Sequence, residues 1–565
     1  MRAGHTRTAG VPDHATRTGG ALPARGGRRR PAHARPRVQD ASSRRFLARA
    51  TLLSAALSIA GAVLGLGRDQ ALAHLFGAGA ETDAFLVAWT VPEVAATLLI
   101  EDGMAFVLVP AFSAALALRA RGQRTPDPVR SLVAASLPRL CLALAATAAV
   151  LAAGAPMLVS ALAPGLSDAS LAVSCTRLTA TCVLSFGLAG YCSAALRAHR
   201  SFLAPGAIYV AYNVAIIATM FVVGAHWGVR SAALGVALGG CLMVAVQAPS
   251  LARRIAGRTG SRALVDDGDG ARPLAPALIC AVLLFALCRQ SQVLIERHLA
   301  SGLPAGAISH LNYAQKVAQL PMSLSLMVCV VTFPVVAQAI AEGDTRRARN
   351  RVERDLVLMS TVLLMGAAVV LAGAPQIVQL LFQRGAFTAQ DTAATAAVMR
   401  VYATGLLGQT LVGALVRSYF AAGRTTWFPL GAMGVGALAT VAIGAWAVGP
   451  WGACGIAAAN AIGITVTALL LLHGLGPGSV PVRVRRVVAD LVRPLCAAAG
   501  ATAAGLLGAG LFASPAASVA VCCLCVSAVF LLLCWILDAA GARSLLLSAV
   551  RFLLPYVTRK LGHGR

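Results

Sequence analysis

Charged side chains interrupt the apolar runs of this chain at only a few places, and these are the residues that could do chemistry. Arg68 and Asp69 end one run, and Glu101 lies inside the next. Lys316, one of only two lysines, lies inside a later run. A charge at bilayer depth usually faces a wet interior, and a lone buried lysine keeps its proton only beside an anion. We expect Lys316 and Glu101 to line a cavity, with Lys316 facing a carboxylate such as Glu101 or an anionic ligand.

The other intramembrane charges gather near these residues. They comprise Asp83, Glu93 and Asp102 in the first stretch, and Arg289, Glu296 and Arg297 in the second. The adjacent pairs Arg68–Asp69 and Glu296–Arg297 are equally explained as ion pairs at helix ends that reach toward the interface. Breaks in the same helices favour hinge motion, and the candidate hinge residues are Pro92, Gly103, Pro110, Pro321 and Pro334.

The composition and the apolar runs predict which kind of secondary structure positions these charges. The chain is 58% hydrophobic and 12% charged, with a mean hydropathy of +0.76, whereas soluble domains carry about 25% charged residues. The apolar runs are continuous rather than alternating, which favours spanning helices over a barrel. We predict an all-α polytopic membrane protein.

The apolar runs predict about 14 transmembrane helices, enough for two six-helix lobes around a central cavity plus two C-terminal helices. The expected spans are residues 47–67, 84–116, 132–162, 169–195, 205–224, 230–251, 274–297, 307–339, 352–382, 393–421, 427–447, 451–473, 488–512 and 516–538.

Arginines between the spans predict the orientation. The net charge is +27, and the basic residues concentrate in every second connection and in both tails, as the positive-inside rule describes for cytoplasmic loops. We therefore expect both termini in the cytoplasm and no nucleic-acid partner. Residues 1–46 are expected to form a disordered basic cytoplasmic tail, with a transit peptide as the alternative, and 541–565 a second basic tail.

An internal repeat predicts the division into lobes. The stretch 68–92 and the stretch 297–321 both run from Arg to Pro, and Gly77 and Asp83 align with Gly306 and Asn312. An even number of spans separates them, which indicates parallel repeats. The expected units are an N-terminal lobe (47–251), a cytoplasmic linker (252–273), a C-terminal lobe (274–474) and two extra helices (475–540).

The 14 cysteines show no metal-ligand spacing. Cys522, Cys523 and Cys525 lie in an apolar run without a nearby histidine or carboxylate, so packing is the expected role and no metal site is predicted.

Three stretches, 64–88, 300–324 and 380–429, resemble the MurJ/MviN lipid II flippase family of the multidrug/oligosaccharidyl-lipid/polysaccharide exporter superfamily. The most specific elements are GRD with FGAGAETDAF, and RGAFTAQDT at 384–392. The resemblance implies a non-enzymatic flippase that moves polyprenyl-pyrophosphate-linked peptidoglycan precursor (lipid II) to the outer leaflet of the bacterial inner membrane. It implies alternating access driven by the membrane potential or a cation gradient, with no cofactor.

The resemblance also implies residue roles. Arg68, Asp69, Asp83 and Glu101 take positions where the family has important charges, Lys316 that of a cavity cation, and Ser309 that of a polar lining residue. We expect substrate binding by Arg68, Asp83, Glu101, Arg289, Ser309 and Lys316, and gating or ion pairing by Asp69, Glu93, Glu296 and Arg297. Membrane lipids and the cell-wall synthesis machinery are the other expected partners.

The chain departs from the family pattern at four positions. Ala62, Ala96 and Thr97 stand where the family commonly has arginine, and Glu93 where it often has asparagine. Each lost charge-assisted contact is worth roughly 1.5–3 kcal/mol. Either the substrate differs, or anion binding has moved elsewhere, for example to Arg289. The alternatives that stay open are a paralogous flippase for another lipid-linked glycan or lipid metabolite, a cation-coupled exporter of small organic cations, and a non-transporting scaffold.

Overall fold

The structure is a computed structural model that describes residues 38–101, 103–120, 127–256, 276–326, 342, 344–421, 426–475, 482–510 and 512–538. By internal contacts the chain divides into two units, 1–49 and 50–565. The first unit contains the start of helix α1, and the second unit, which is the subject below, contains the rest of the helices. The expected tails and Pro334 lie outside the described residues, as does most of the expected linker.

The described residues of the N-terminal half are helical throughout, with short connections. The elements are α1 (Val38–Phe76), α2 (Ala80–Ala88), α3 (Thr90–Ala95), the π-helix η1 (Ala96–Glu101), α4 (Gly103–Ala120), α5 (Pro128–Ala153), α6 (Ala155–Leu162), α7 (Ala169–Ala180), α8 (Cys182–Ala198), α9 (Leu203–Trp227) and α10 (Arg230–Ala256).

The C-terminal half continues with α11 (Pro276–Ala300), α12 (Ala307–Ala318), α14 (Thr345–Phe382), α15 (Ala389–Ala421), α16 (Phe428–His473), α17 (Val484–Ala509) and α18 (Pro515–Ile536). The described part of the chain holds nine helices that are long and apolar enough to cross a membrane. The chain is therefore an all-α polytopic membrane protein, as predicted.

Each of the fourteen expected spans coincides at least partly with a described helix. The span expected at 84–116 is divided into α2, α3, η1 and α4, and Pro92 lies inside the short α3. The two spans expected at 427–473 form the single element α16, with a sharp kink at Gly452, whose φ is +53°. A positive φ is readily adopted only by glycine, so Gly452 marks the turn between two antiparallel arms.

Close backbone approaches hold the broken second span in place. Gly190 of α8 lies directly against the backbone of η1. A Cβ added to Gly190 would lie 1.9 Å from the carbonyl oxygen of Leu99, so only glycine allows the two helices to come this close. π-Helical turns are rare and often mark functional sites. Ala96 and Thr97, where arginines were expected from the family, belong to this turn, and the Thr97 hydroxyl donates to the Glu93 carbonyl (3.2 Å).

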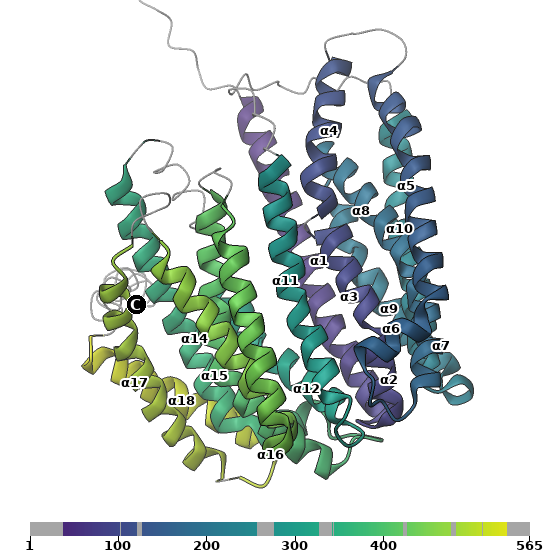
Figure 1. Ribbon diagram of the computed structural model, residues 1–565. Coiled ribbons are helices and arrows are strands. Elements are labelled where there is room, and N and C mark those ends of the chain that lie inside the picture. The colour runs from purple at the N-terminus through teal and green to yellow at the C-terminus, as the bar shows by residue number, and fades with distance from the viewer. Residues whose placement is uncertain are drawn as a thin grey trace, which may run out of the picture. The chain divides into compact units, whose positions relative to one another are not determined.

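Neighbouring helices in the chain are mostly neighbours in space, and Figure 1 shows α9 beside α10 and α17 beside α18. Contacts between the two halves of the described chain join α2 to α12, and α11 to α3, α6 and η1. These elements belong to the two repeated stretches and their surroundings. The charged residues of the repeats therefore meet where the halves touch.

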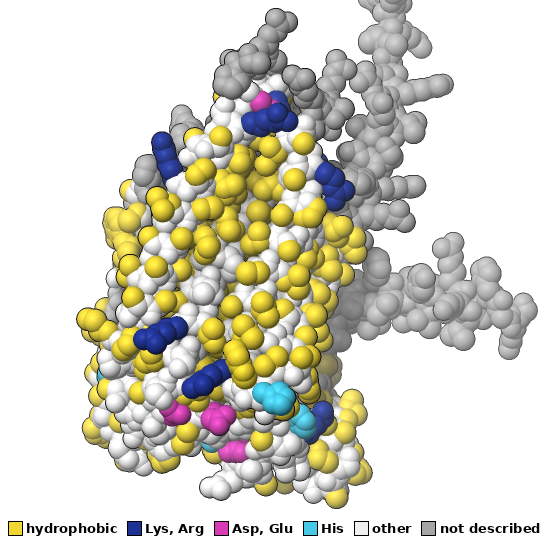
Figure 2. All heavy atoms as spheres, turned by 90° about the vertical axis from the view of Figure 1, so that its right-hand side faces the viewer, with side chains coloured by type: hydrophobic (Ala, Val, Ile, Leu, Met, Phe, Trp, Pro, Cys, Tyr) yellow, Lys and Arg dark blue, Asp and Glu magenta, His cyan; other side chains and the backbone are white. Residues whose placement is uncertain are grey.

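One face of the molecule displays the pattern of a membrane-embedded surface. In Figure 2, hydrophobic side chains cover the middle of this face, Lys and Arg lie toward both its upper and its lower end, and acidic and histidine side chains lie mainly near its lower end. An apolar band between charged ends is the surface that a bilayer covers.

Candidate functional site

Two cations from opposite halves share one buried carboxylate. Arg68 of α1 donates to Asp69 Oδ1 through Nε (3.1 Å) and Nη2 (2.8 Å). Lys316 of α12 lies 3.1 Å from Asp69 Oδ2 and 3.3 Å from Oδ1. Asp69 is 5% exposed, so it depends on both cations for the charge compensation that water would otherwise supply.

Neighbouring groups orient the two cations. The Arg68 guanidinium lies 4.4 Å from the ring centre of Trp89, and the Lys316 ammonium 5.8 Å from the same ring. Arg68 also donates to Asn213 Oδ1 of α9 (3.2 Å), and the Asn213 amide in turn donates to the carbonyls of Gly61 and Tyr209. The negative face of the indole ring attracts a cation, so Trp89 helps to hold both charges in place.

Lys316 has a carboxylate partner, as expected, but this carboxylate is Asp69 and not the example Glu101, which accepts from the Tyr209 hydroxyl (3.2 Å). The sequence alone could not distinguish these carboxylates, because Asp69 lies within the first repeated stretch and Glu101 follows closely after it. The Arg68–Asp69 pair exists as expected, but it is largely buried rather than extended toward the interface.

Arg297 forms the second charged link between the halves. Its guanidinium donates to Glu93 Oε2 of α3 (2.8 Å) and to the Thr90 hydroxyl. The expected pairing of Glu296 with its neighbour Arg297 is replaced, because Glu296 accepts instead from the Asn460 amide of α16. Successive helical residues point in different directions, so Arg297 reaches the opposite half while Glu296 remains within its own.

Asp83 of α2 forms the N-cap of a helix in the other half. Its carboxylate accepts from Gly306 N (2.7 Å), Ser309 N (2.8 Å) and the Ser309 hydroxyl (2.5 Å). The capping position of α12 itself is occupied by Gly306, which has no side chain to offer. An anion at a helix N-terminus satisfies unpaired N–H groups and interacts favourably with the helix dipole. Asp83 and Ser309 thus meet as a link between the halves.

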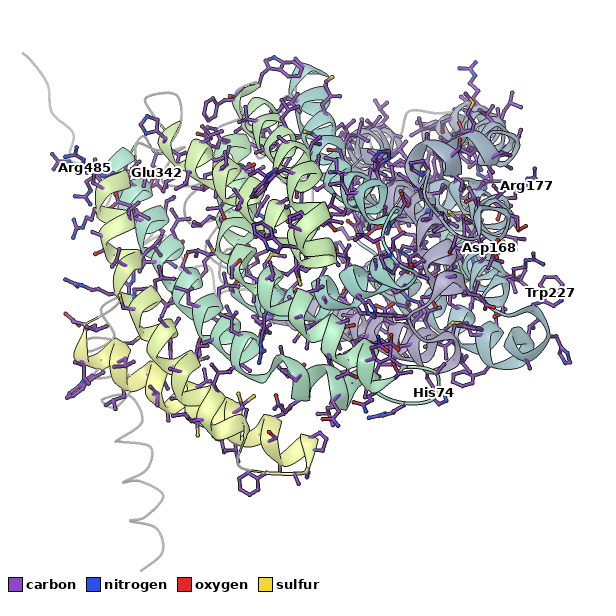
Figure 3. The ribbon with its side chains drawn as sticks, turned by 60° about the horizontal axis from the view of Figure 1, so that its bottom comes forward. His74, Asp168, Arg177, Trp227, Glu342 and Arg485 are labelled. Atoms are coloured by element: carbon purple, nitrogen blue, oxygen red, sulfur yellow. The ribbon has the colours of Figure 1, made fainter. Side chains whose placement is uncertain are left out.

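Three glycines with positive φ interlock three connections at the same end of the helices. A Cβ added to Gly77 would lie 2.7 Å from the Ala386 carbonyl oxygen, one on Gly306 2.5 Å from that of Ala78, and one on Gly385 2.3 Å from that of His74. Ala386 N also donates to the His74 carbonyl (2.9 Å) (His74 in Figure 3). The FGAG and RGAF elements therefore contact each other in the fold. The linear sequence does not reveal this contact.

The remaining predicted residues have varied surroundings. Arg289 is exposed on α11. Gly103 begins α4, Pro110 lies inside α4, and Pro321 follows a break at Gln319 and packs closely against Gly366. Sequence reasoning missed Trp89, Thr90, Asn213 and Asn460, because an uncharged residue in an apolar run gives no signal until its partner is known.

The polar contacts of the two halves differ between the two ends of the helices. At the end that holds Asp83 and Arg297, the polar contacts cross between the halves. At the opposite end, the described ion pairs stay within one half: Arg119 with Asp127, and Arg483 with Glu353 (2.7 Å). Hydrogen bonds from Arg119 hold the pKa of Asp127 below its usual range. On the expected orientation, the cross-linked end is the outer end.

Comparisons with known protein sequences identify the family of this chain. The chain matches the sequence model of the family described as "Lipid II flippase MurJ" over residues 72–528. The lipid II flippase MurJ of Burkholderia cenocepacia is 28% identical over 440 residues, covering 76% of this chain and 84% of the relative. The probable lipid II flippase MurJ of Bdellovibrio bacteriovorus is 26% identical over 464 residues, covering 81% and 87%.

Solved structures share the fold. A lipid II flippase MurJ in an inward closed conformation superposes with a TM-score of 0.67 at 18% identity, covering 88% of this chain and all of that one. An inward-facing multidrug resistance MATE family transporter of the MOP superfamily gives 0.58 at 14% identity, covering 78% and 98%. These similarities support the fold.

The glycine interlock predicts a difference between two neighbouring substitutions. Gly77→Ala places a Cβ against Ala386 at a positive φ, so we expect a loss of about 1–2 kcal/mol, measured as a lower thermal midpoint of the detergent-solubilised protein. Gly79→Ala is the matched control, because Gly79 has an extended backbone and no atom of the described residues within 4 Å of its added Cβ. Equal midpoints for the two variants would refute the interlock.

The cap made by Asp83 predicts a local change in hydrogen exchange. Asp83→Ala removes the acceptor oxygens of all three hydrogen bonds, so amides at the start of α12 should exchange about five- to thirtyfold faster, the equivalent of ~1–2 kcal/mol. Ser309→Ala removes one of the three bonds and should have a smaller effect. Unchanged exchange at residues 307–310 in Asp83→Ala would show that the carboxylate does not stabilise this helix end.

Proposed function

Since the chain belongs to the lipid II flippase MurJ family, we propose that it moves lipid II, a polyprenyl-pyrophosphate-linked peptidoglycan precursor, from the cytoplasmic to the outer leaflet. The protein acts as a transporter rather than an enzyme, because the chemical bonds of the cargo stay intact. The single observation that carries the proposal is the pair of cations, Arg68 and Lys316, held together across the halves by the buried Asp69.

A pyrophosphate is a suitable replacement for the Asp69 carboxylate. It presents several anionic oxygens, and a guanidinium and an ammonium are the donors that such oxygens prefer. With the cargo bound, the two cations exchange part of their contact with Asp69 for contact with the pyrophosphate. Asp69 therefore prepares the site by keeping two like charges together before the cargo arrives.

The links between halves provide the gate. The cap made by Asp83, the Arg297–Glu93 pair and the glycine interlock together close one end. Releasing them at that end and forming contacts at the other would expose the site alternately to the two leaflets, which is alternating access. The broken elements α2, α3 and η1, with Pro92 and Pro110, supply the hinges for this movement.

The proposed location is the bacterial inner membrane, with both termini in the cytoplasm. The basic residues Arg119, Arg253 and Arg254 at the ends of α4 and α10 support this orientation. Membrane lipids surround the protein, and the cell-wall synthesis machinery is the partner that would consume its product.

A second candidate cargo is another polyprenyl-pyrophosphate glycan. The observation that favours it is the neutralisation of Arg297 by Glu93, at a position where the family often has asparagine, together with the uncharged Ala96 and Thr97 in η1. Fewer uncompensated cations weaken the hold on a strongly anionic head group, so recognition would depend more on the sugars.

A cation gradient is the proposed source of energy, with Glu296 as the coupling group. Glu296 is buried, accepts from Asn460, and lies beside Tyr402. The Oδ1 atom of Asn460 has no hydrogen-bond partner among the described residues. A buried carboxylate beside an unpaired amide oxygen offers a place for a proton or a small cation to bind and leave.

The rescue of cells depleted of their own lipid II flippase tests the proposal. The wild-type protein should restore growth, and Arg68→Ala and Lys316→Ala should each lose roughly tenfold or more in rescue, because each removes a charge-assisted contact worth about 1.5–3 kcal/mol. Lys316→Arg keeps the charge and should retain most activity. Arg177→Ala is the control, since Arg177 is exposed at the rim of the helices (Figure 3).

Growth of Arg68→Ala and Lys316→Ala cells at the wild-type rate, at matched protein levels, would contradict the site assignment. Failure of the well-expressed wild-type protein, combined with movement of a different polyprenyl-pyrophosphate glycan in vesicles, would favour the second cargo.

Vesicle transport of fluorescent lipid II tests the coupling. The wild-type rate should respond to an imposed proton or sodium gradient, and Glu296→Gln should lose that response because the amide cannot take up a charge. Glu81→Gln changes an exposed carboxylate and serves as the control. A full gradient response in Glu296→Gln would remove this residue from the coupling mechanism.

A further inference from the structure

The tryptophans of the chain occupy particular places in the fold. Of the six, Trp89 is buried beside Arg68. The other five are between 49% and 68% exposed, and each lies at or near a helix end or kink. They are Trp227 at the end of α9, Trp427 before α16, Trp446 and Trp451 at the kink of α16, and Trp535 near the end of α18.

Trp446 and Trp451 form a pair just before the α16 turn at Gly452. Their ring centres are 5.3 Å apart at an interplanar angle of 85°, an edge-to-face geometry. They are also the two most exposed tryptophans, although aromatic pairs in soluble proteins are usually covered. The turn at Gly452 places both rings at one end of the first arm of α16, and Trp427 lies at the other end.

The spacing along this arm matches the thickness of a bilayer. Nineteen residues separate 427 and 446 in the sequence, which corresponds to about 29 Å of helix. The hydrocarbon core of a bilayer is about 30 Å thick. Between the two ends, Val435, Leu438 and Val441 are exposed at helical spacing and form an apolar stripe.

We propose that these five tryptophans bind the lipid headgroup regions of the two leaflets and set the position of the protein in the membrane. Trp227, Trp446 and Trp451 lie at the outer interface, and Trp427 and Trp535 at the inner one. An indole has an apolar ring and one N–H donor, which suits the boundary between acyl chains and headgroups. Figure 3 shows Trp227 projecting away from the helices, as such an anchor must.

The anchors have a consequence for movement. The first arm of α16 is attached to both interfaces, and α16 packs against α11 and α15. The C-terminal half therefore has a fixed register in the bilayer, and opening of the links to the other half takes place relative to that register. The proposal concerns lipid contact and stands apart from the identity of the cargo.

Depth-dependent fluorescence quenching tests the proposal. Single-tryptophan variants, with the other tryptophans changed to Phe, are placed in phosphatidylcholine vesicles that carry bromine either near the acyl carbonyl or near the chain end. Each of the five should be quenched at least about twofold more by the shallow bromine. A variant that keeps only Trp89 should be quenched by neither, because Trp89 is buried. Stronger quenching by the deep bromine, or none by either, would overturn the assignment for that residue.

The unmodified protein gives a second test that does not depend on substitutions. Its thermal midpoint in vesicles of increasing acyl-chain length should be highest where the hydrocarbon core is about 29 Å thick, since mismatch costs a fraction of a kcal/mol per Å. A midpoint that rises steadily with thickness would contradict the spacing argument. Because neither test involves transport, their failure would leave the proposed function untouched.

Discussion

A carboxylate inside an apolar protein must find donors, and this requirement determines how the two halves meet. Asp69 and Asp83 are each about 95% buried, and both complete their set of partners in the opposite half, at Lys316 and at the start of α12. Left unpaired in a membrane interior, such groups would cost several kcal/mol. The closed end of the protein is therefore stabilised by the same charges that, in the proposed mechanism, the cargo and the opening movement redistribute.

The remaining features serve this arrangement. The positive-φ glycines allow the connections between helices to pack closely against one another. A carbonyl oxygen of one connection lies where a Cβ would stand on the glycine of another. Trp89 and Asn213 hold Arg68 in place, so that its charge lies between the halves. Arg297 adds a second link through Glu93. The contacts concentrate at one end, as a gate requires, and the opposite end carries ion pairs within each half.

The helices could be predicted from the sequence because hydropathy acts locally: twenty apolar residues span a bilayer wherever they occur. Arg68, Asp83 and Lys316 could be selected as well, since a charge in an apolar run is costly and stands out. The partners of these residues could not be predicted from the sequence. Lys316 pairs with Asp69 rather than Glu101, and Arg297 with Glu93 rather than with its neighbour Glu296. Only the packing of α11 and α12 against the first stretch decides between these carboxylates.

The distance between the two halves at their linked end tests the central claim most directly. Spin labels at the exposed positions Met157 of α6 and Gly449 of α16, introduced without cysteine because the chain has 14 cysteines, report this distance by electron–electron double resonance in vesicles. The protein without cargo should show a single narrow distribution, and Asp83→Ala should add a longer-distance population. A distribution in Asp83→Ala identical to that of the wild type would contradict the claim that the buried carboxylates hold this end closed.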